Sequence, residues 1–244
     1  MAEPRNLPAR IVAIANDNAF AFGCHQQLEC FTECCRMLEL ALSPYDVLRL
    51  RRGTGLTSKQ LLEQYIVIEH NGGDPFPCLY LSMVDDGRAS CVFVGKSGCS
   101  IYPHRPGACR TFPLGRGVSR SPEALSERFV LIKEYFCKGF EEKTRQTPHE
   151  YLSQQETAAY HRFNDRFAEI LQHDAIKKGF MPSPRDIEWF LLLLFDLDSL
   201  RTRIAKERLP ELPLTAGDME RLDADEDLLE VTLQLLPQLI FPQE

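Results

Sequence analysis

The sequence lacks several motifs that mark common enzyme and membrane classes. It has no glycine-rich phosphate loop, because Gly53-Thr54-Gly55 lacks a third glycine and follows a predicted helix instead of a strand. It also has no nucleophile elbow and no His-Glu-x-x-His pair. The longest apolar run, residues 190–195, is far shorter than the ~20 residues that cross a bilayer. These absences weigh against a Rossmann-type methyltransferase or dehydrogenase, and we expect no membrane span.

Basic residues are fewer than acidic residues. The 28 Lys and Arg residues against 35 Asp and Glu residues give a net charge of -7, which argues against a general nucleic-acid binder. The acidity is concentrated in residues 211–230, where Arg221 is the one basic residue. We interpret this run as a solvated helix face, with a docking surface for a basic partner as the alternative. No secretory signal is recognisable in residues 1–10, so we expect a cytoplasmic protein.

Cysteine, in contrast, is abundant, with nine residues. In a reducing compartment a cysteine-rich segment indicates metal binding or redox chemistry more than disulfide bonds. Four cysteines fall between Gly23 and Cys35, and the others are spread along the chain to residue 137. We predict eight metal ligands: Cys24, Cys30, Cys34, Cys35, Cys91, Cys99, Cys109 and Cys137. The ninth, Cys78, is predicted to take no part.

The spacing of these cysteines limits the kind of site. The chain has no Cys-x2-Cys pair, which disfavours a plain zinc ribbon. Adjacent side chains such as Cys34 and Cys35 point apart on most backbones, so they tend to serve different metals or different corners of one cluster. Eight thiolates then suit either a 4Fe-4S cluster, which takes four, plus a second metal, or two four-thiolate sites.

The predicted fold class is mainly α with two small β-hairpins, an irregular, loop-rich cysteine-cluster domain packed on C-terminal helices. Helix starts are indicated by capping signals at Ser43, Thr57, Thr147 and Ser183. The expected helices cover residues 34–38, 44–53, 58–67, 184–204 and 216–236, the last ending at Pro237. Short strands are expected at 11–14 and 20–22, and hairpins pair 79–84 with 91–94 and 112–118 with 128–133. We divide the chain into a metal-binding domain, 1–144, and a helical region, 145–244, packed against it.

The cysteine pattern resembles the CxxCxxCC-type family of zinc- or iron-chelating cysteine-cluster proteins (YkgJ-like). The resemblance rests on Cys24-His25, residues 30–35, residues 42–50, Cys99 and Tyr102, residues 105–115, and Cys137-Lys138-Gly139-Phe140. It implies a zinc or iron–sulfur cofactor. Some relatives in this family resemble lysine N-methylases that act on flagellin, and others are assigned as oxidoreductases. The resemblance therefore also implies one of these two enzyme classes as an alternative.

The sequence departs from the namesake pattern in two ways. Its first two spacers have five and three residues instead of two and two, and Gln26-Gln27 stands where the subgroup tends to have Pro-Gly. Because that turn chemistry is missing, we expect Cys24 to be the weakest of the eight ligands. Seven secure thiolates would leave one coordination position open, as a catalytic metal requires.

Charged residues beside the cysteines have two possible roles. Arg105 and Arg110 flank Cys109 and could bind an anionic substrate or offset the charge of the thiolates. Alternatively, they form structural ion pairs with Glu29, Glu33 or Glu39, and we favour a structural or second-shell role. His25 and His104 are weaker candidates for ligands.

The sequence thus predicts a metal-binding cysteine-cluster protein that holds an iron–sulfur cluster or zinc and depends on it for folding. Its activity and partners are not predicted. One alternative is an iron–sulfur-dependent oxidoreductase or a protein-lysine N-methylase-like enzyme. The other is a structural zinc protein that serves as an interaction module.

Overall fold

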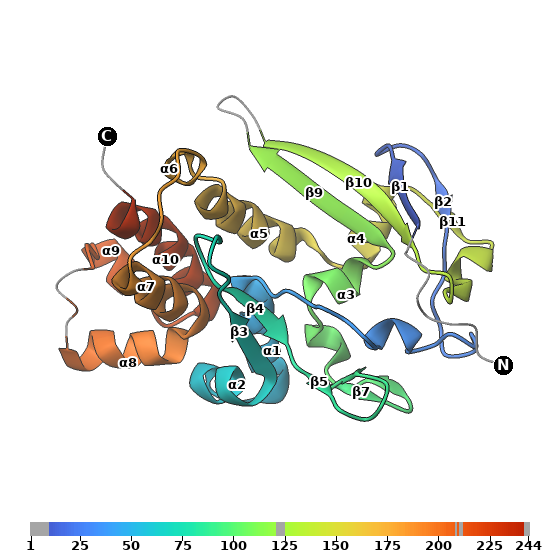
Figure 1. The fold of residues 1–244 in the computed structure, drawn as a ribbon, viewed down its shortest axis with the longest axis horizontal. Helices are drawn as coiled ribbons and strands as arrows, with labels where there is room; N and C mark the ends of the chain where they lie inside the picture. The colour runs from blue at the N-terminus through green and yellow to red at the C-terminus, as the bar shows by residue number, and fades with distance from the viewer. Residues whose placement is uncertain (1–9, 121–124, 208, 210–211, 242–244) are drawn as a thin grey trace. The chain divides into compact units, whose positions relative to one another are not determined.

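The structure is a computed structural model that describes residues 10–120, 125–207, 209 and 212–241 (Figure 1). Its internal contacts divide the chain into two compact units. The first combines the chain up to Leu38 with Met83–Ala159, and the second combines Glu39–Ser82 with the chain from Tyr160 onward. The division at residue 144 predicted from the sequence follows the chain, whereas these units interleave along it. All eight predicted ligands belong to the first unit, and Cys78 belongs to the second.

The largest sheet of the first unit is antiparallel, in the order β1-β10-β9. It consists of β1 (Arg10–Ile14), β9 (Leu114–Arg120) and β10 (Leu125–Lys133). The predicted hairpin of 112–118 with 128–133 is confirmed as β9 and β10, and the strand predicted at 11–14 pairs along β10. A core of buried apolar side chains lies beside this sheet: Phe20, Phe22, Leu114, Phe129, Leu131, Tyr151 and Leu152.

The rest of the first unit consists of short elements joined by turns. Three pairs of two-residue strands are antiparallel: β2 (Phe20–Ala21) with β11 (Arg145–Gln146), β5 (Met83–Val84) with β6 (Ser90–Cys91), and β7 (Val94–Gly95) with β8 (Gly98–Cys99). The helical elements are α3 (Gly107–Thr111), α4 (Pro148–Gln154) and 3-10 turns at Glu33–Cys35, Tyr102–His104 and Lys138–Glu141. This unit therefore contains the irregular, loop-rich part of the chain.

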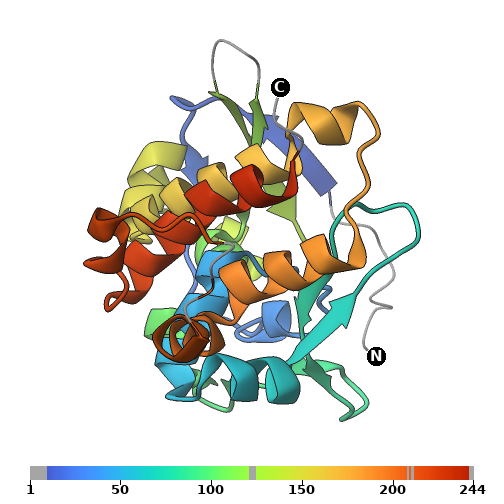
Figure 2. The ribbon, with the colours of Figure 1, turned by 90° about the vertical axis from the view of Figure 1, so that its left-hand side faces the viewer.

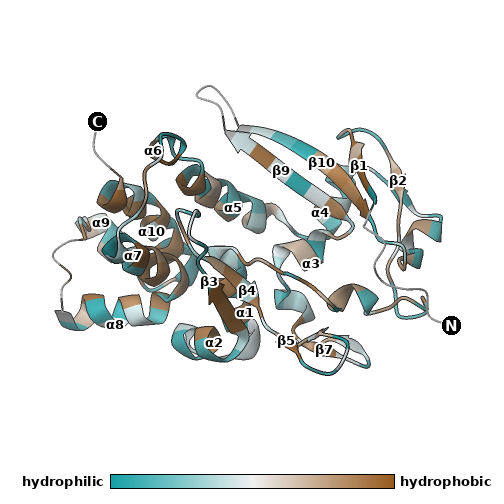
Figure 3. Cartoon of the chain, in the orientation of Figure 1, coloured by the Kyte–Doolittle hydropathy of each residue, from teal (hydrophilic) through white to brown (hydrophobic). Residues whose placement is uncertain are grey.

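The second unit is mainly helical. Its helices are α1 (Pro44–Thr54), α2 (Ser58–Tyr65), α5 (Ala158–Leu171, whose first two residues belong to the first unit), α6 (Asp174–Lys177), α7 (Pro184–Phe195), α8 (Leu197–Glu207), α9 (Ala216–Met219) and α10 (Asp225–Ile240). Its two-stranded sheet pairs β3 (Ile66–Glu69) with β4 (Cys78–Leu81). In Figure 2, α7 in orange and α10 in red lie side by side, in agreement with their contacts. Figure 3 shows hydrophobic residues gathered on α7 and β3.

The predicted helix starts are confirmed by complete capping boxes. The side chains of Ser43, Thr57, Thr147 and Ser183 each accept a hydrogen bond from the backbone N–H three residues on, and the acid or amide at that position bonds back. Among the described residues, no helix is both long and apolar enough to cross a membrane.

Two of the predicted helices of the N-terminal half are wrong in extent. Residues 34–38 form no helix beyond the turn at Glu33–Cys35, because Arg36 makes a β-bridge to Ser90 and Met37 has a positive φ of 51°. The helix that starts after Thr57 ends at Tyr65, because Ile66 begins strand β3. In both places pairing with a distant strand overrides the local helical pattern.

Three other expectations are also corrected. The helix predicted over 184–204 breaks at Asp196, whose φ of -118° and ψ of 60° separate α7 from α8. The last predicted helix is two helices, α9 and α10, and Pro237 lies inside α10 instead of ending it. In the first predicted hairpin, Met83 and Val84 pair with Cys91 and Ser90, but residues 78–81 pair with β3 instead.

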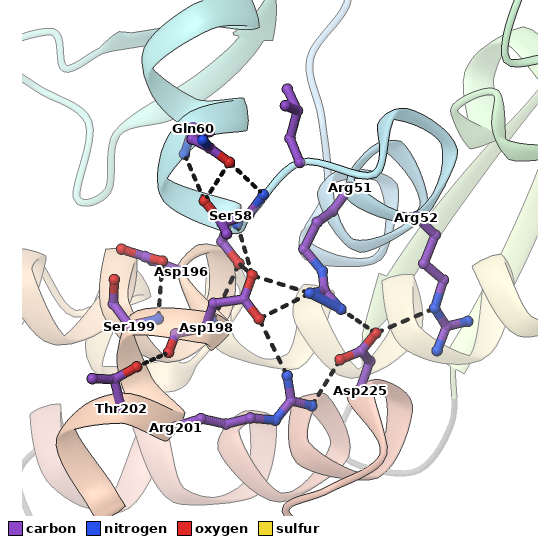
Figure 4. Close-up of polar contacts among 12 residues, drawn as sticks. Arg51, Arg52, Ser58, Gln60, Asp196, Asp198, Ser199, Arg201, Thr202 and Asp225 are labelled. Atoms are coloured by element: carbon purple, nitrogen blue, oxygen red, sulfur yellow. Dashed lines mark hydrogen bonds and ion pairs between the residues drawn. The ribbon is translucent and has the colours of Figure 1, made fainter. Parts of the chain in front are cut away.

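A network of arginines and acids links α1, α8 and α10 within the second unit (Figure 4). Arg51 donates to both carboxylate oxygens of Asp198 at 2.8 and 3.0 Å and to Asp225 at 2.5 Å. Arg201 donates to Asp225 at 2.7 Å, and the backbone N–H of Ser58 donates to Asp198 at 2.8 Å. Part of the acidic run at 211–230 therefore pairs within the protein, where the sequence suggested a solvated face.

We expect the change Arg51→Met to destabilise the protein by about 1–3 kcal/mol at neutral pH, because two half-buried carboxylates lose their partner. Burial alone would raise the pKa of Asp225, but hydrogen bonds from Arg51 and Arg201 outweigh it and hold the pKa below its ordinary value. Stability gained in this way is present above the ordinary pKa of about 4 and is lost as the pH falls through the lower, folded-state pKa. The difference between variant and parent should therefore shrink on acidification, as measured by urea unfolding at several pH values.

The matched control is Lys59→Met, which removes a 3.9 Å pair between side chains that are 70% and 63% exposed. We expect a change within about 0.5 kcal/mol at any pH. An equal loss in both variants would contradict the role given to Arg51.

Candidate metal centre

The cysteine-rich segment has almost no apolar support of its own. Residues 23–39 are all described, and none of them is buried. Their one helical element is the 3-10 turn at Glu33–Cys35, which has no side-chain cap. A segment with so little buried surface must be held by contacts with other segments or by a bound group.

Backbone contacts bring Cys24, Cys30 and Cys137 together. The N–H of Gly23 donates to the carbonyl of Gly139 at 3.0 Å, which places Cys24 beside the 3-10 turn that follows Cys137. The N–H of Lys138 donates to the Cys30 sulfur at 3.2 Å, and the thiols of Cys30 and Cys137 share a hydrogen bond. The electrostatic coupling of Cys24 to both Cys30 and Cys137 agrees with this arrangement.

A second set of contacts brings Cys35, Cys91 and Cys99 together. The antiparallel bridge of Arg36 to Ser90 sets the preceding Cys35 opposite the following Cys91. The chain then turns through the β7–β8 hairpin, where Cys99 pairs with Val94, and the charge of Cys35 acts on the other two thiols. The Arg36 side chain also donates to the Ser90 hydroxyl, which fixes the bridge.

Cys34 and Cys109 complete the cysteine cluster. The Cys34 thiol donates a hydrogen bond to the Cys35 sulfur, and it is coupled to Cys24 and Cys109. This hydrogen bond raises the pKa of Cys34 and lowers that of Cys35, so Cys35 is the first of the pair to ionise. All eight predicted thiols are thus connected by mutual electrostatic contacts.

Burial keeps several of these thiols protonated when no metal neutralises their charge. It raises the pKa of Cys91 and of Cys137 to about 11 and also raises that of Cys99. Although Cys24 is exposed at the surface, the surrounding protein removes enough water to raise the pKa of its thiol, and Cys30 and Cys35 raise it further. A thiophilic metal binds thiolates, so its binding must release protons.

Arg105 is the cation that acts on both sets of thiols. It is 8% exposed, donates to the Tyr102 carbonyl and the Gln155 side chain at 2.8 Å each, and lies 3.7 Å from the centre of the Tyr102 ring. Its charge favours the thiolates of Cys24 and Cys99. This position agrees with the second-shell role favoured from the sequence.

The other charged candidates have the following positions. Arg110 is buried and donates to the carbonyls of Gln155 and Pro103 at 2.8 Å each, with Glu156 at 3.6 Å. His25 is exposed, and its Nε2 atom lies 3.5 Å from Glu142, while His104 ends the turn Tyr102–His104. Arg110 thus links the turn Tyr102–His104 to the end of α4.

The main-chain hydrogen bonds that position the thiols are not predicted from the sequence. Lys138 and Gly139 act through main-chain N–H and carbonyl groups, so their side chains carry no signal of this role. The run Cys137-Lys138-Gly139-Phe140 belongs to the family pattern, and the structure gives the physical reason for its glycine. A Cβ atom at Gly139 would lie 2.5 Å from the Phe22 ring, so this position requires glycine.

The donor set fits a thiophilic metal in chemistry. Within the part of the chain that the structure describes, no three His, Cys, Asp or Glu side chains close around a common point. Eight thiols nevertheless come from four chain segments to one electrostatically connected cluster, and thiolates prefer zinc, copper(I) or the iron of iron–sulfur clusters.

The comparison with protein families agrees with this chemistry. Residues 23–138, a little under half of the chain, match the family CxxCxxCC, described as a putative zinc- or iron-chelating domain. The matched range begins one residue before Cys24 and ends one after Cys137. The match agrees with the resemblance predicted from the sequence. The search of curated proteins and the search of solved structures give no match.

Proposed function

We propose that the cysteine cluster holds a resident iron–sulfur cluster or zinc through Cys24, Cys30, Cys34, Cys35, Cys91, Cys99, Cys109 and Cys137. The observation that carries this proposal is that these eight thiols are connected within one compact unit, whereas Cys78 lies in the other unit. The bound metal would neutralise thiolates that burial disfavours and would fix a segment without buried side chains. Because the cytoplasm keeps thiols reduced and available to bind metal, we place the protein there.

The hydrogen-bond donors near the cluster support the same proposal. The N–H of Lys138 points to the Cys30 sulfur at 3.2 Å, and the buried Arg105 favours two of the thiolates. Donors and cations of this kind lower the cost of gathering negative sulfurs around a metal.

The test is anaerobic purification of the full chain, followed by elemental analysis and a visible spectrum. We expect stoichiometric iron or zinc, and visible absorption where iron is bound. The change Cys109→Ala should lower the metal content strongly, whereas Cys78→Ala should leave it unchanged. Metal-free protein that melts cooperatively at an ordinary temperature would overturn the proposal, and equal loss in the two variants would refute the choice of ligands.

An enzymatic role is the second candidate, either as an iron–sulfur-dependent oxidoreductase or as a protein-lysine N-methylase-like enzyme. The exposure of Cys24 favours it, since a weak, solvent-facing ligand can leave a coordination position open. In a structural zinc module all positions are closed. Loss of Cys24 with full retention of metal would favour the catalytic alternative, and loss of metal with Cys24 would favour the closed site.

A further inference from the structure

We propose that the eight cysteines build two separate metal centres, one around Cys24, Cys30 and Cys137 and the other around Cys35, Cys91 and Cys99. This inference rests on the proposed function and adds the number of centres and the ligands of each. Cys34 and Cys109 would supply their remaining ligands.

The first centre joins the start of the cysteine-rich segment to the turn after β10. Hydrogen bonds from Gly23 to Gly139 and from Lys138 to the Cys30 sulfur hold residues 23–30 against this turn. Phe22, the residue before Gly23, is buried and packs against Phe140 with ring centres 5.3 Å apart, so the contact rests on the apolar core of the unit. The backbone around Cys24, Cys30 and Cys137 is therefore held by hydrogen bonds next to this core.

The second centre joins the end of the cysteine-rich segment to the hairpins at 83–99. The β-bridge of Arg36 to Ser90 and the hydrogen bond from the Met37 N–H to the Ala89 carbonyl at 2.8 Å hold residues 35–37 against β6. Farther along, the N–H of Ser100 donates to the Phe93 carbonyl at 2.9 Å, which closes the loop between Cys91 and Cys99. The second centre is thus held by β6 and the loop up to Ser100, whereas the first is held by the turn after Cys137.

The two sets separate within the turn at Glu33–Cys35. Cys30 belongs to one set and Cys35 to the other, and the intervening Thr32 has a positive φ of 69°, which changes the direction of the chain. On one side of this turn the Cys30 sulfur accepts the Lys138 N–H at 3.2 Å, and on the other side the bridge of Arg36 to Ser90 follows Cys35.

The number of cysteines also favours two centres. A tetrahedral zinc ion or a 4Fe-4S cluster takes four thiolates. A single centre would leave four more thiols, most of them half-buried, without a function in the cluster. Two centres use all eight.

The experiment compares Cys30→Ser, Cys91→Ser and the double variant with the parent, all as full-length, anaerobically purified protein. Iron and zinc per chain are measured by elemental analysis, and the reactive thiols are identified by alkylation and mass spectrometry. Each single variant should lose one part of the metal and keep the rest, and the two lost parts should add up to the content of the parent. In Cys91→Ser, the thiols of Cys24, Cys30 and Cys137 should stay protected while Cys35 and Cys99 become alkylated.

A measurement on the parent protein removes the risk that a variant misfolds. During stepwise removal of metal by a chelator, one set of three thiols should become reactive before the other. Simultaneous exposure of both sets, or complete loss of metal in each single variant while the parent holds metal, would overturn the two-centre proposal. A parent protein without metal would overturn the proposed function itself.

Discussion

Removal of metal from the reduced protein should release residues 24–37 from protection against amide hydrogen exchange, while α7 and α10 keep their protection. The reason is the lack of buried side chains in residues 23–39, which leaves this segment without an apolar core to hold it. A structural zinc site contributes an apparent ~10–16 kcal/mol to folding in small domains, so the change in protection should span several orders of magnitude. Hydrogen exchange with mass spectrometry, before and after chelation, measures it.

Helices α7 and α10 serve as the internal control because Phe190, Leu193 and Leu228 among their residues are at most 1% exposed. These side chains form a core that contains no cysteine, so it should not respond to the chelator. Return of protection after zinc or iron is restored would show that the release is reversible. Protection of residues 24–37 that is equal with and without metal would contradict a role of the metal in holding the segment.

Gly139→Ala should destabilise the protein by about 3 kcal/mol, at the upper end of the cost of overpacking. A Cβ atom at this position would lie 2.5 Å from a carbon of the Phe22 ring and 2.7 Å from the Gly23 carbonyl oxygen. The backbone oxygen has little freedom to move, because the Gly23 N–H is bonded to the carbonyl of Gly139 itself. We therefore expect a lower midpoint of chemical unfolding and a reduced metal content, because the same contact positions Cys24 and Cys137.

The matched control is Gly72→Ala, where a Cβ atom would meet nothing within 4 Å. Its stability should stay within about 0.5 kcal/mol of the parent, and its metal content should be unchanged. If Gly139→Ala were as stable as Gly72→Ala, the close approach of these two chain segments would not be required for folding.

The parts of the fold that could be predicted are those encoded by neighbouring residues. The capping boxes at Ser43, Thr57 and Ser183 each occupy four consecutive positions, so the start of each helix could be read directly. The ends could not, because they depend on distant segments. Ile66 leaves the helical pattern to pair with Leu81, and the stop at Asp196 separates two helices that share one apolar periodicity.

The candidate site shows the same limit. Residue type and clustering were enough to name eight candidate ligands and to set Cys78 apart. Their grouping could not be predicted, because it depends on contacts between residues far apart in the sequence, such as Arg36 with Ser90 and Gly23 with Gly139. The expected helix at 34–38 would have pointed Cys34 and Cys35 differently, and the observed turn is stabilised by a strand more than fifty residues away.

The interleaving of the two units has a consequence for dissecting the protein. A fragment of residues 23–138, the range that matches the CxxCxxCC family, would carry every proposed ligand. It would also carry α1 and α2 without α7, α8 and α10, the helices they contact in the intact chain. Leu48, Leu50 and Leu61, each at most 3% exposed in the whole protein, would then face water. An excised domain should therefore tend to aggregate however well it binds metal, and the shortest well-behaved piece that retains the cluster extends through α10.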